Sequence, residues 1–310
     1  MNKVSIVMAV YNPNIDYLKK QLQSIEDQTY RNLELIVYDD CPEHRTDIKI
    51  FDNILKNTKY RFLDYEDKNL GYIKVFEKLV SNVEDSKYIA FCDQDDIWES
   101  NKIEKMVESL EKSNSNLAIC DRMIIDENDN IVKHYDDGSR TDIIGKWKEA
   151  NDIYLLAPFQ TIGPGMSIVC NAEFAKRVLP YDPVAFDKWL ICCAALENKI
   201  IKVTDELVRY RRHSNNVSGV LNGINSKEDY YKYRVESHNY VVNKLNNLYK
   251  DSSSFDLKPL IEFSKARINK NIFKLFKYRY VCKVQAKFEI VLALIPNFMF
   301  KLFLKVLRKD

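Results

Sequence analysis

The sequence predicts an α/β protein with a mostly parallel sheet, helices on both faces of that sheet, and a C-terminal helical extension. In the first third of the chain, short apolar runs alternate with longer segments of helical periodicity, as in parallel sheets covered on both faces. From residue 226 onward the pattern is mostly helical. We therefore expect an α/β domain over residues 1–225, with halves at 1–121 and 122–225, and a helical extension over 226–310.

The expected elements follow one another in order. Strands are predicted where β-branched and aromatic residues form short runs bounded by turn residues, over Lys3–Val10, Leu33–Tyr38, Tyr60–Leu63, Tyr88–Cys92, Met166–Cys170 and Ile200–Val203. Helices are predicted where apolar residues recur every three or four positions, over Asp16–Gln28, Thr46–Lys56, a segment opened by Gly71, Ser100–Leu110 and Phe186–Asn198. Turns are expected at 126–130, 136–138 and 163–165, because Asp, Asn, Gly and Pro cluster there.

Charge is distributed unevenly along the 310 residues. The net charge is +2, but residues 258–310 carry thirteen Lys or Arg against three acids, which leaves 34 basic and 42 acidic residues in 1–257. A basic tail on an acidic body indicates an anionic partner for the tail. We expect that partner to be a membrane surface and expect no nucleic-acid partner.

The cysteines and the N-terminus indicate a cytoplasmic protein. Seven cysteines are scattered through apolar stretches without a CxxC pair, which favours reduced, buried thiols. The apolar run near the N-terminus lacks a basic flank and a small-residue cleavage site, so it is interpreted as the first strand and not as a signal peptide.

Acidic residues follow two of the expected strands. Asp39-Asp40 follow the second, and Asp93, Asp95 and Asp96 follow the fourth, where open α/β sheets bind ligands. Three carboxylates within four residues repel one another unless a cation compensates, and oxygen ligands suit Mg²⁺ or Mn²⁺. The alternatives are a helix N-cap for the second cluster and a plain turn for Asp39-Asp40.

Two further segments carry candidate functional groups. Asp187 begins an apolar helix, where it is either a helix cap or a general base that reaches an acceptor hydroxyl. The segment Tyr210–Gly219 (YRRHSNNVSG) combines fixed positive charge with polar donors. Arginine matches phosphate oxygens, although a solvated basic loop is the alternative.

In their order along residues 1–219, these segments resemble glycosyltransferase family 2, which has the GT-A fold, and within it the bacterial rhamnosyltransferase-like branch. The most specific feature is the string DQDDIW at 93–98, which resembles the DxD metal motif. The sequence departs from the family pattern in two places. Asp39-Asp40 is followed by Cys-Pro-Glu, and Asp187 stands in Phe-Asp-Lys where the family usually has His-Asp-Trp.

The resemblance implies a role for each matching residue. Asp187 is implied as the catalytic base, and Asp95 with Asp93 as ligands of Mg²⁺ or Mn²⁺. The residues implied in nucleotide-sugar binding are Tyr11, Asn12, Asp39, Asp40, Asn69, Gly71, Asp93, Gln94, Arg212 and His213. Those implied on the acceptor side are Gly165, Met166 and Trp189.

The implied activity is inverting transfer of a sugar, with L-rhamnose as the leading candidate, from a dTDP- or UDP-sugar to a saccharide or lipid-linked saccharide of the cell surface. Another hexose or galactofuranose fits the same motifs. A sugar-phosphate nucleotidylyltransferase requires a Gly-rich loop, which residues 9–14 lack, and a dehydrogenase requires GxGxxG, which is absent. A non-catalytic membrane adaptor is the third alternative.

The tail predicts attachment to the inner face of the cell membrane. The apolar run Ile290–Ile295 is too short to span a bilayer and ends at Pro296. In the helix expected after it, Lys301, Lys305 and Lys309 form a stripe opposite Met299, Phe303 and Leu307, as in interfacial helices. The alternative is a helical hairpin that docks on the catalytic domain or on a second subunit, which leaves a homodimer open.

Overall fold

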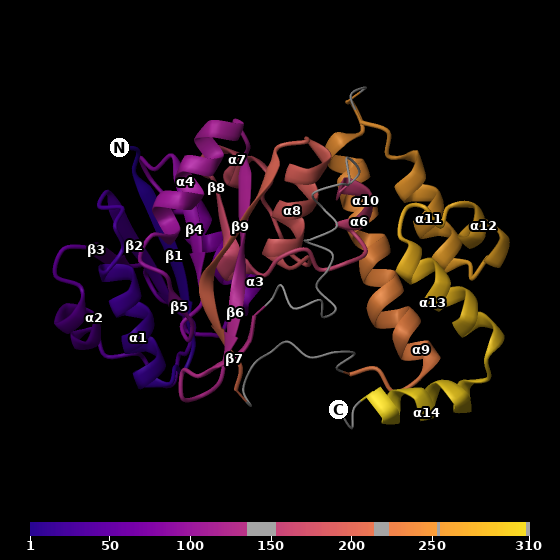
Figure 1. Cartoon of the computed structure of the whole chain (residues 1–310), viewed down its shortest axis with the longest axis horizontal. Helices are drawn as coiled ribbons and strands as arrows, with labels where there is room; N and C mark the ends of the chain where they lie inside the picture. The colour runs from indigo at the N-terminus through magenta and orange to yellow at the C-terminus, as the bar shows by residue number, and fades with distance from the viewer. Residues whose placement is uncertain (135–152, 214–222, 253–254, 308–310) are drawn as a thin grey trace. The chain divides into compact units, whose positions relative to one another are not determined.

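The computed structural model describes residues 1–134, 153–213, 223–252 and 255–307 (Figure 1). The chain forms two compact units. The first consists of Met1–Asn151 and Ile162–Ser214, and the second of Asp152–Thr161 and Asn215–Asp310. The short segment 152–161 thus belongs with the C-terminal helices, far from it in sequence. The turn expected at 136–138 lies outside the described residues.

The first unit contains a nine-stranded mixed sheet in its described part, with the order β3-β2-β1-β4-β8-β6-β9-β5 and β7 paired to β6. Strands β1 to β4 are mutually parallel, and β6 is parallel to β9, whereas β8, β7 and β5 run antiparallel to their neighbours. The strands are β1 Val4–Val10, β2 Leu33–Asp39, β3 Lys59–Phe62, β4 Tyr88–Cys92, β5 Ile97–Trp98, β6 Leu117–Ile125, β7 Ile131–His134, β8 Ile168–Asn171 and β9 Ile200–Arg211.

Helices cover both faces of this sheet, as its apolar strands require. On one face, α1 (Ile15–Glu26), α2 (Lys49–Ile54) and α4 (Lys102–Ser113) bury their apolar sides in one core with alternate residues of β1 and β2. On the other, Phe76 of α3 (Tyr72–Ser81) and Phe186 of α8 (Phe186–Leu196) pack on Phe91 of β4. Helix α7 (Ala172–Arg177) follows β8 directly.

The predicted α/β class is therefore confirmed, and the elements of the first half agree closely with prediction. Strand β4 has the predicted bounds, and α3 begins one residue after Gly71. Several elements were missed, among them the short strands β5 and β7 and helix α7, which have no predicted counterpart. No strand was expected over β6, and β9 runs eight residues beyond Val203, because charged residues in both strands hide the apolar pattern.

The second unit is helical, as expected from residue 226 onward. Its helices are α6 Ile153–Leu156, α9 Lys227–Tyr230, α10 Glu236–Tyr249, α11 Lys258–Ile268, α12 Ile272–Lys277, α13 Lys283–Leu294 and α14 Asn297–Leu307, with a π-helical turn at Tyr231–Val235. A buried ion pair crosses its core: Arg267 Nη2 lies 2.7 Å from Glu289 Oε1, to which the Tyr230 hydroxyl also donates. In the described part of the chain, no helix has both the length and the apolarity needed to cross a bilayer.

Candidate active site

The carboxyl ends of β1, β2 and β4 lie side by side and bring together the loops that the sequence singled out. Strand β1 lies between the other two, with Val10 paired to Asp39 and Met8 paired to Cys92. The residues that follow these strands therefore share one edge of the sheet. This edge is where an open α/β sheet binds its ligand.

Asp40 holds the loop that precedes α3. Its two carboxylate oxygens accept hydrogen bonds from the backbone N–H groups of Leu70 (2.7 Å) and Gly71 (2.9 Å), and the Asn69 side chain donates to the Asp40 carbonyl (3.1 Å). Gly71 has φ +79°, which side chains disfavour. The structure thus brings Asp40, Asn69 and Gly71 together, and Asp40 shapes this loop through its backbone.

Asp39 holds the loop after β2 in the same way. Its carboxylate is almost fully buried and accepts backbone hydrogen bonds from Cys41 (3.0 Å) and Thr46 (2.7 Å). The Arg45 side chain donates to the carbonyl of Asp39. Both carboxylate oxygens therefore already have partners. Asp39 and Asp40 together hold the backbone of the loops at this edge of the sheet.

Gln94 connects the first loop to the acidic loop. Its amide accepts from the Tyr11 N–H (2.8 Å) and donates to the Tyr11 carbonyl (3.1 Å). Tyr11 itself is 52% exposed, and Asn12 beside it has φ 40°. Gln94 thus fixes the backbone from which the Tyr11 ring projects into solvent, at the carboxyl edge.

The acidic loop holds more negative charge than its surroundings compensate. Burial, then the charges of Asp95 and Asp187, raises the pKa of Asp93 to about 7, and burial raises the pKa of Asp96 well above its usual value. Two buried cations lie nearby, Lys102 and Arg211. Lys102 donates to the Met166 carbonyl (2.7 Å) and stands over the Trp98 ring, and burial lowers its pKa to about 8. The loop is therefore suited to an additional positive charge.

The end of β9 contacts the acidic loop through Arg211 and His213. His213 Nε2 lies 2.8 Å from a carboxylate oxygen of Asp95. Arg211 is fully buried, donates to the carbonyls of Asp95 (2.9 Å) and Asp126 (3.0 Å), and stands over the Tyr17 ring. Arg212 is exposed, with its backbone N–H bonded to Ile125. Residues 214–219 of the predicted segment lie outside the described part.

The sequence singled out Arg211 only as part of the segment Tyr210–Gly219, and its burial beside the acidic loop was not expected. In a strand, successive side chains point to opposite faces, so extending β9 through Arg211 puts Arg211 and Arg212 on different sides. The β-forming run Leu207–Tyr210 carried that signal. Because the strand was expected to end at Val203, the alternation was not applied to the two arginines.

Asp187 begins α8 and lies partly buried near the acidic loop. Its carboxylate accepts from the Lys188 N–H (2.7 Å). Burial raises the pKa of Asp187, and the charge of Asp187 in turn raises the pKa of both Asp93 and Tyr72. Phe186, the residue before Asp187, stacks on Phe91 of β4 at a centroid distance of 4.8 Å. Asp187 and Asp93 therefore lie near one another, although 94 positions separate them in the sequence.

The three residues predicted on the acceptor side, Gly165, Met166 and Trp189, are all buried. Trp189 and Met166 are 1% exposed, and the Trp189 indole N–H donates to the Val178 carbonyl (2.7 Å). Gly165 is also buried: a Cβ there would meet the Phe186 ring at 2.4 Å. Gly165 and Trp189 pack around the start of α8, whereas Met166 belongs to the core that α1 and α4 cover, so none of the three lines the surface.

Replacing Gly165 by alanine is expected to destabilise the fold by about 1–3 kcal/mol, the usual cost of an overpacked core. The Phe186 ring cannot simply move away, because it packs on Phe76 and Phe91 at centroid distances of 4.1 and 4.8 Å. Chemical denaturation measures the effect. Adding Phe186→Leu should recover part of the loss, and wild-type stability of Gly165→Ala alone would show that the ring is not fixed.

The donor set fits a divalent ion only with help from a ligand. Asp93 and Asp95 offer the oxygen atoms that Mg²⁺ and Mn²⁺ prefer, next to uncompensated negative charge. Among the residues described in the structure, however, no three His, Cys, Asp or Glu side chains converge closely enough to hold a metal ion. A site in which one or two carboxylates and the phosphate oxygens of a substrate together bind Mg²⁺ is common.

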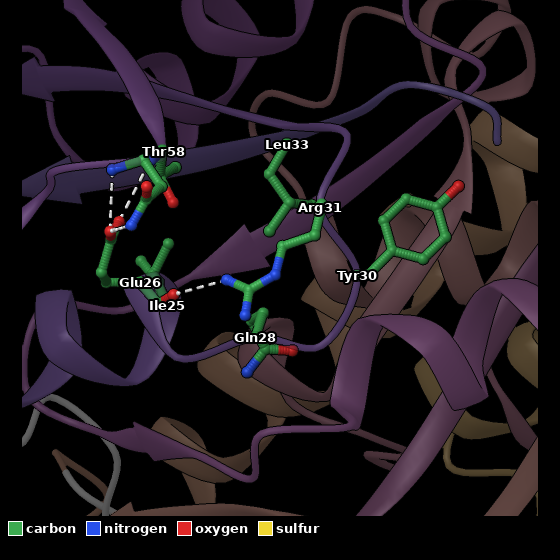
Figure 2. A pocket seen from close by; sticks show the side chains of 8 residues that line it. Ile25, Glu26, Gln28, Tyr30, Arg31, Leu33 and Thr58 are labelled. Atoms are coloured by element: carbon green, nitrogen blue, oxygen red, sulfur yellow. Dashed lines mark hydrogen bonds between the residues drawn. The ribbon is translucent and has the colours of Figure 1, made fainter.

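A small pocket lies at the opposite edge, around the amino end of β2 (Figure 2). Ile25, Gln28, Tyr30, Arg31, Leu33 and Asn57 are among its lining residues. In it the Glu26 carboxylate accepts hydrogen bonds from Asn57 and Thr58, which lower the pKa of Glu26 although burial opposes them. These bonds join α1 to the loop before β3, and we assign the pocket a structural role.

Comparison with known proteins identifies the class to which this fold and site belong. A model of glycosyl transferase family 2 matches residues 5–172, more than half of the chain, so the chain belongs to that family. The chain is 29% identical over 241 residues to an uncharacterised glycosyltransferase of Methanocaldococcus jannaschii. This alignment covers 76% of this chain and 79% of the relative. It is 26% identical over 314 residues to the dTDP-rhamnosyl transferase RfbG of Shigella flexneri, covering 94% and 99%.

Solved structures confirm the GT-A fold. The chain is similar to the mannosyltransferase PcManGT of Pyrobaculum calidifontis in complex with GDP-Man and Mn²⁺, at a TM-score of 0.56 and 16% identity, covering 92% of this chain and 75% of the other. It is also similar to S. aureus TarS 1–349 in complex with UDP-GlcNAc, at a TM-score of 0.55 and 15% identity, covering 90% and 91%. At such identities the likeness establishes the fold alone.

Proposed function

We propose that this family 2 glycosyltransferase is an inverting enzyme that transfers L-rhamnose from dTDP-L-rhamnose to a growing cell-surface polysaccharide or another lipid-linked saccharide. The observation that carries the proposal is the stacking of Phe186 on Phe91 of β4, which brings the neighbouring Asp187 close to the Asp93–Asp95 loop. The choice of sugar is supported by the dTDP-rhamnosyl transferase RfbG, to which nearly the whole chain aligns. A lipid-linked acceptor would place the enzyme at the cytoplasmic face of the cell membrane.

The proposed reaction assigns one proton transfer to Asp187. Its carboxylate accepts the proton of an acceptor hydroxyl while the hydroxyl oxygen attacks the anomeric carbon from the face opposite the diphosphate. The bond between the anomeric carbon and the diphosphate oxygen breaks, so the configuration inverts. A raised pKa suits Asp187 to this role, because a stronger base takes the proton more readily.

The proposed donor site lies between the loops after β1, β2 and β4. Tyr11 and Asn12 face the nucleotide, with their loop fixed by Gln94. Asp39, Asp40, Asn69 and Gly71 form the wall of the site. Asp95 with Asp93 would hold Mg²⁺ or Mn²⁺, which supplies positive charge to the diphosphate when bound. Arg212 and His213 complete the site beside Asp95.

The proposed division of labour follows the sequence. Residues 1–225 carry catalysis, with donor binding in 1–121 and acceptor binding in 122–225, and residues 226–310 attach the enzyme to its acceptor surface. A non-catalytic adaptor would have no need for the uncompensated charge around Asp93. A UDP-hexose or UDP-galactofuranose donor is the main alternative to dTDP-rhamnose, since other sugar donors fit the same motifs.

Thermal unfolding with dTDP-, UDP-, GDP- and CDP-sugars, each with and without Mn²⁺, tests the proposal. A ligand that binds only the native state stabilises it by about 2.7 kcal/mol at a hundredfold excess over its dissociation constant. We expect a metal-dependent rise in Tm with dTDP-L-rhamnose. A rise with a UDP-sugar alone would replace rhamnose by a hexose or galactofuranose, and no coupling between metal and any nucleotide would favour the adaptor.

A further inference from the structure

Helix α14 is apolar on two opposite sides. One side is buried: Phe300 and Leu304 are 0% and 2% exposed and belong to a core cluster with Tyr230, Val235 and Leu292. At 100° per residue, Phe298, Met299, Leu302 and Phe303 lie on the other side, with exposures of 64%, 46%, 57% and 42%. We call these four residues the outer stripe of α14.

The docked side of α14 is firmly held, so the outer stripe cannot simply rotate inward. The Asn297 side chain accepts from the Lys227 N–H (3.2 Å) and donates to Glu228 (3.1 Å), and the Lys227 ammonium donates to the Ile295 carbonyl. Both partners belong to α9, which Figure 1 shows next to α14. Helix α14 therefore docks within the helical unit itself, and not on the catalytic domain or second subunit that the sequence offered as docking partners. The outer stripe stays exposed.

The charged side chains of the segment that carries the outer stripe are nearly all basic, although the exposed acid Glu228 of α9 lies at the start of α14. Residues 269–307 contain eight Lys or Arg and one acid, Glu289, which is fully buried against Arg267. Lys301 and Lys305 are exposed and lie between the docked side and the outer stripe. Val284 and Val291, also exposed, share one side of α13 with Lys287. An apolar stripe with a basic border is typical of helices that lie in an anionic membrane interface.

The same charges disfavour a second copy of this chain as the partner. In a two-fold dimer each surface meets its own copy, so the lysines bordering one outer stripe would face those bordering the other. Anionic lipid headgroups instead compensate Lys301 and Lys305 while the acyl region receives the aromatic and aliphatic side chains.

We propose that the outer stripe of α14 inserts into the surface of an anionic lipid bilayer, with Lys301 and Lys305 at the headgroups. The proposal deepens the attachment role proposed for residues 226–310, but it does not rest on the transfer reaction, so it can be tested without donor or acceptor. Failure here would leave the proposed reaction untouched, and failure of the reaction would leave this surface untouched.

Flotation of the full chain with vesicles tests the proposal. We expect binding to vesicles of phosphatidylcholine with phosphatidylglycerol, weakened by salt, and little binding to phosphatidylcholine alone. The double variant Phe298→Ser, Leu302→Ser should lower the partition coefficient about tenfold or more, because apolar area no longer enters the bilayer. The variant Lys301→Gln, Lys305→Gln should lower binding only to the anionic vesicles.

Val132→Ser is the matched control, since it removes an exposed apolar side chain of β7 in the first unit; it should bind as the wild type does. Circular dichroism and the Tm with nucleotide should be the same for all variants, because every substituted side chain is exposed. Absence of wild-type binding to anionic vesicles, or serine-variant binding equal to wild type, would overturn the proposal. So would a concentration-dependent dimer that the serine variant abolishes, which would assign the stripe to a second copy.

Discussion

Replacing Asp187 by asparagine is expected to lower kcat for sugar transfer by about 10²–10⁴-fold, the usual contribution of a positioned general base. Asparagine has nearly the same shape, and it retains an oxygen that can accept from the Lys188 N–H. It cannot take a proton from the acceptor hydroxyl. Donor binding, measured by the nucleotide-dependent rise in Tm, should stay unchanged.

The pH dependence of kcat gives an independent reading of the same role. Burial raises the pKa of Asp187, and only its ionised form acts as a base. Activity should therefore decline, as the pH falls, at a higher pH than an ordinary aspartate would give. Asp182→Asn is the matched control, because Asp182 is an exposed acid five positions away. Near-normal turnover of Asp187→Asn would remove this residue from the chemistry.

Replacing Asp95 by alanine is expected to abolish transfer and the metal-dependent part of nucleotide binding together. At a hundredfold excess of nucleotide, the stabilisation lost would be about 2.7 kcal/mol. The fold should persist, since the Asp95 carboxylate lies against His213 near the surface and the bond from Arg211 goes to the backbone carbonyl. Calorimetric titration of Mn²⁺ with and without nucleotide measures the coupling.

Asp205→Asn is the control for this variant, because Asp205 is an acid of β9 that pairs with Lys105 through an exposed side chain. It should keep the full coupling between metal and nucleotide. If Asp95→Ala kept metal-dependent nucleotide binding, the ion would have to be held elsewhere or not needed. Because two carboxylates alone make a poor site, wild-type enzyme without nucleotide should bind Mn²⁺ weakly.

Local patterns were sufficient for the donor half of the fold. The strands there are short and apolar, the helices have one apolar side, and these periodicities depend on neighbours in sequence. They placed Asp39, Asp40 and Asp93 at strand ends, and strand order then brought the three loops to one edge. The same approach failed for β9, whose charged residues interrupt its apolar pattern.

The sequence could not say what each polar side chain does within the site. Asp40 and Gln94 are both interpreted as nucleotide contacts on the motif alone, yet in the structure each is engaged with backbone of another loop. Trp189 shares a short motif with Asp187 but points into the core. Neighbouring residues on a helix face different directions, and only packing decides which of them reaches the surface.

By itself, then, the sequence determined the class of fold and the strand ends at which acids gather, because these follow from local periodicity, and the order of its motifs carried the resemblance to the family. Tertiary structure decided which arginine of β9 is buried and how Phe186 on Gly165 sets Asp187 near Asp93. It also decided that α14 docks on one side and exposes the other. Those outcomes depend on contacts between residues tens of positions apart, and no local pattern contains them.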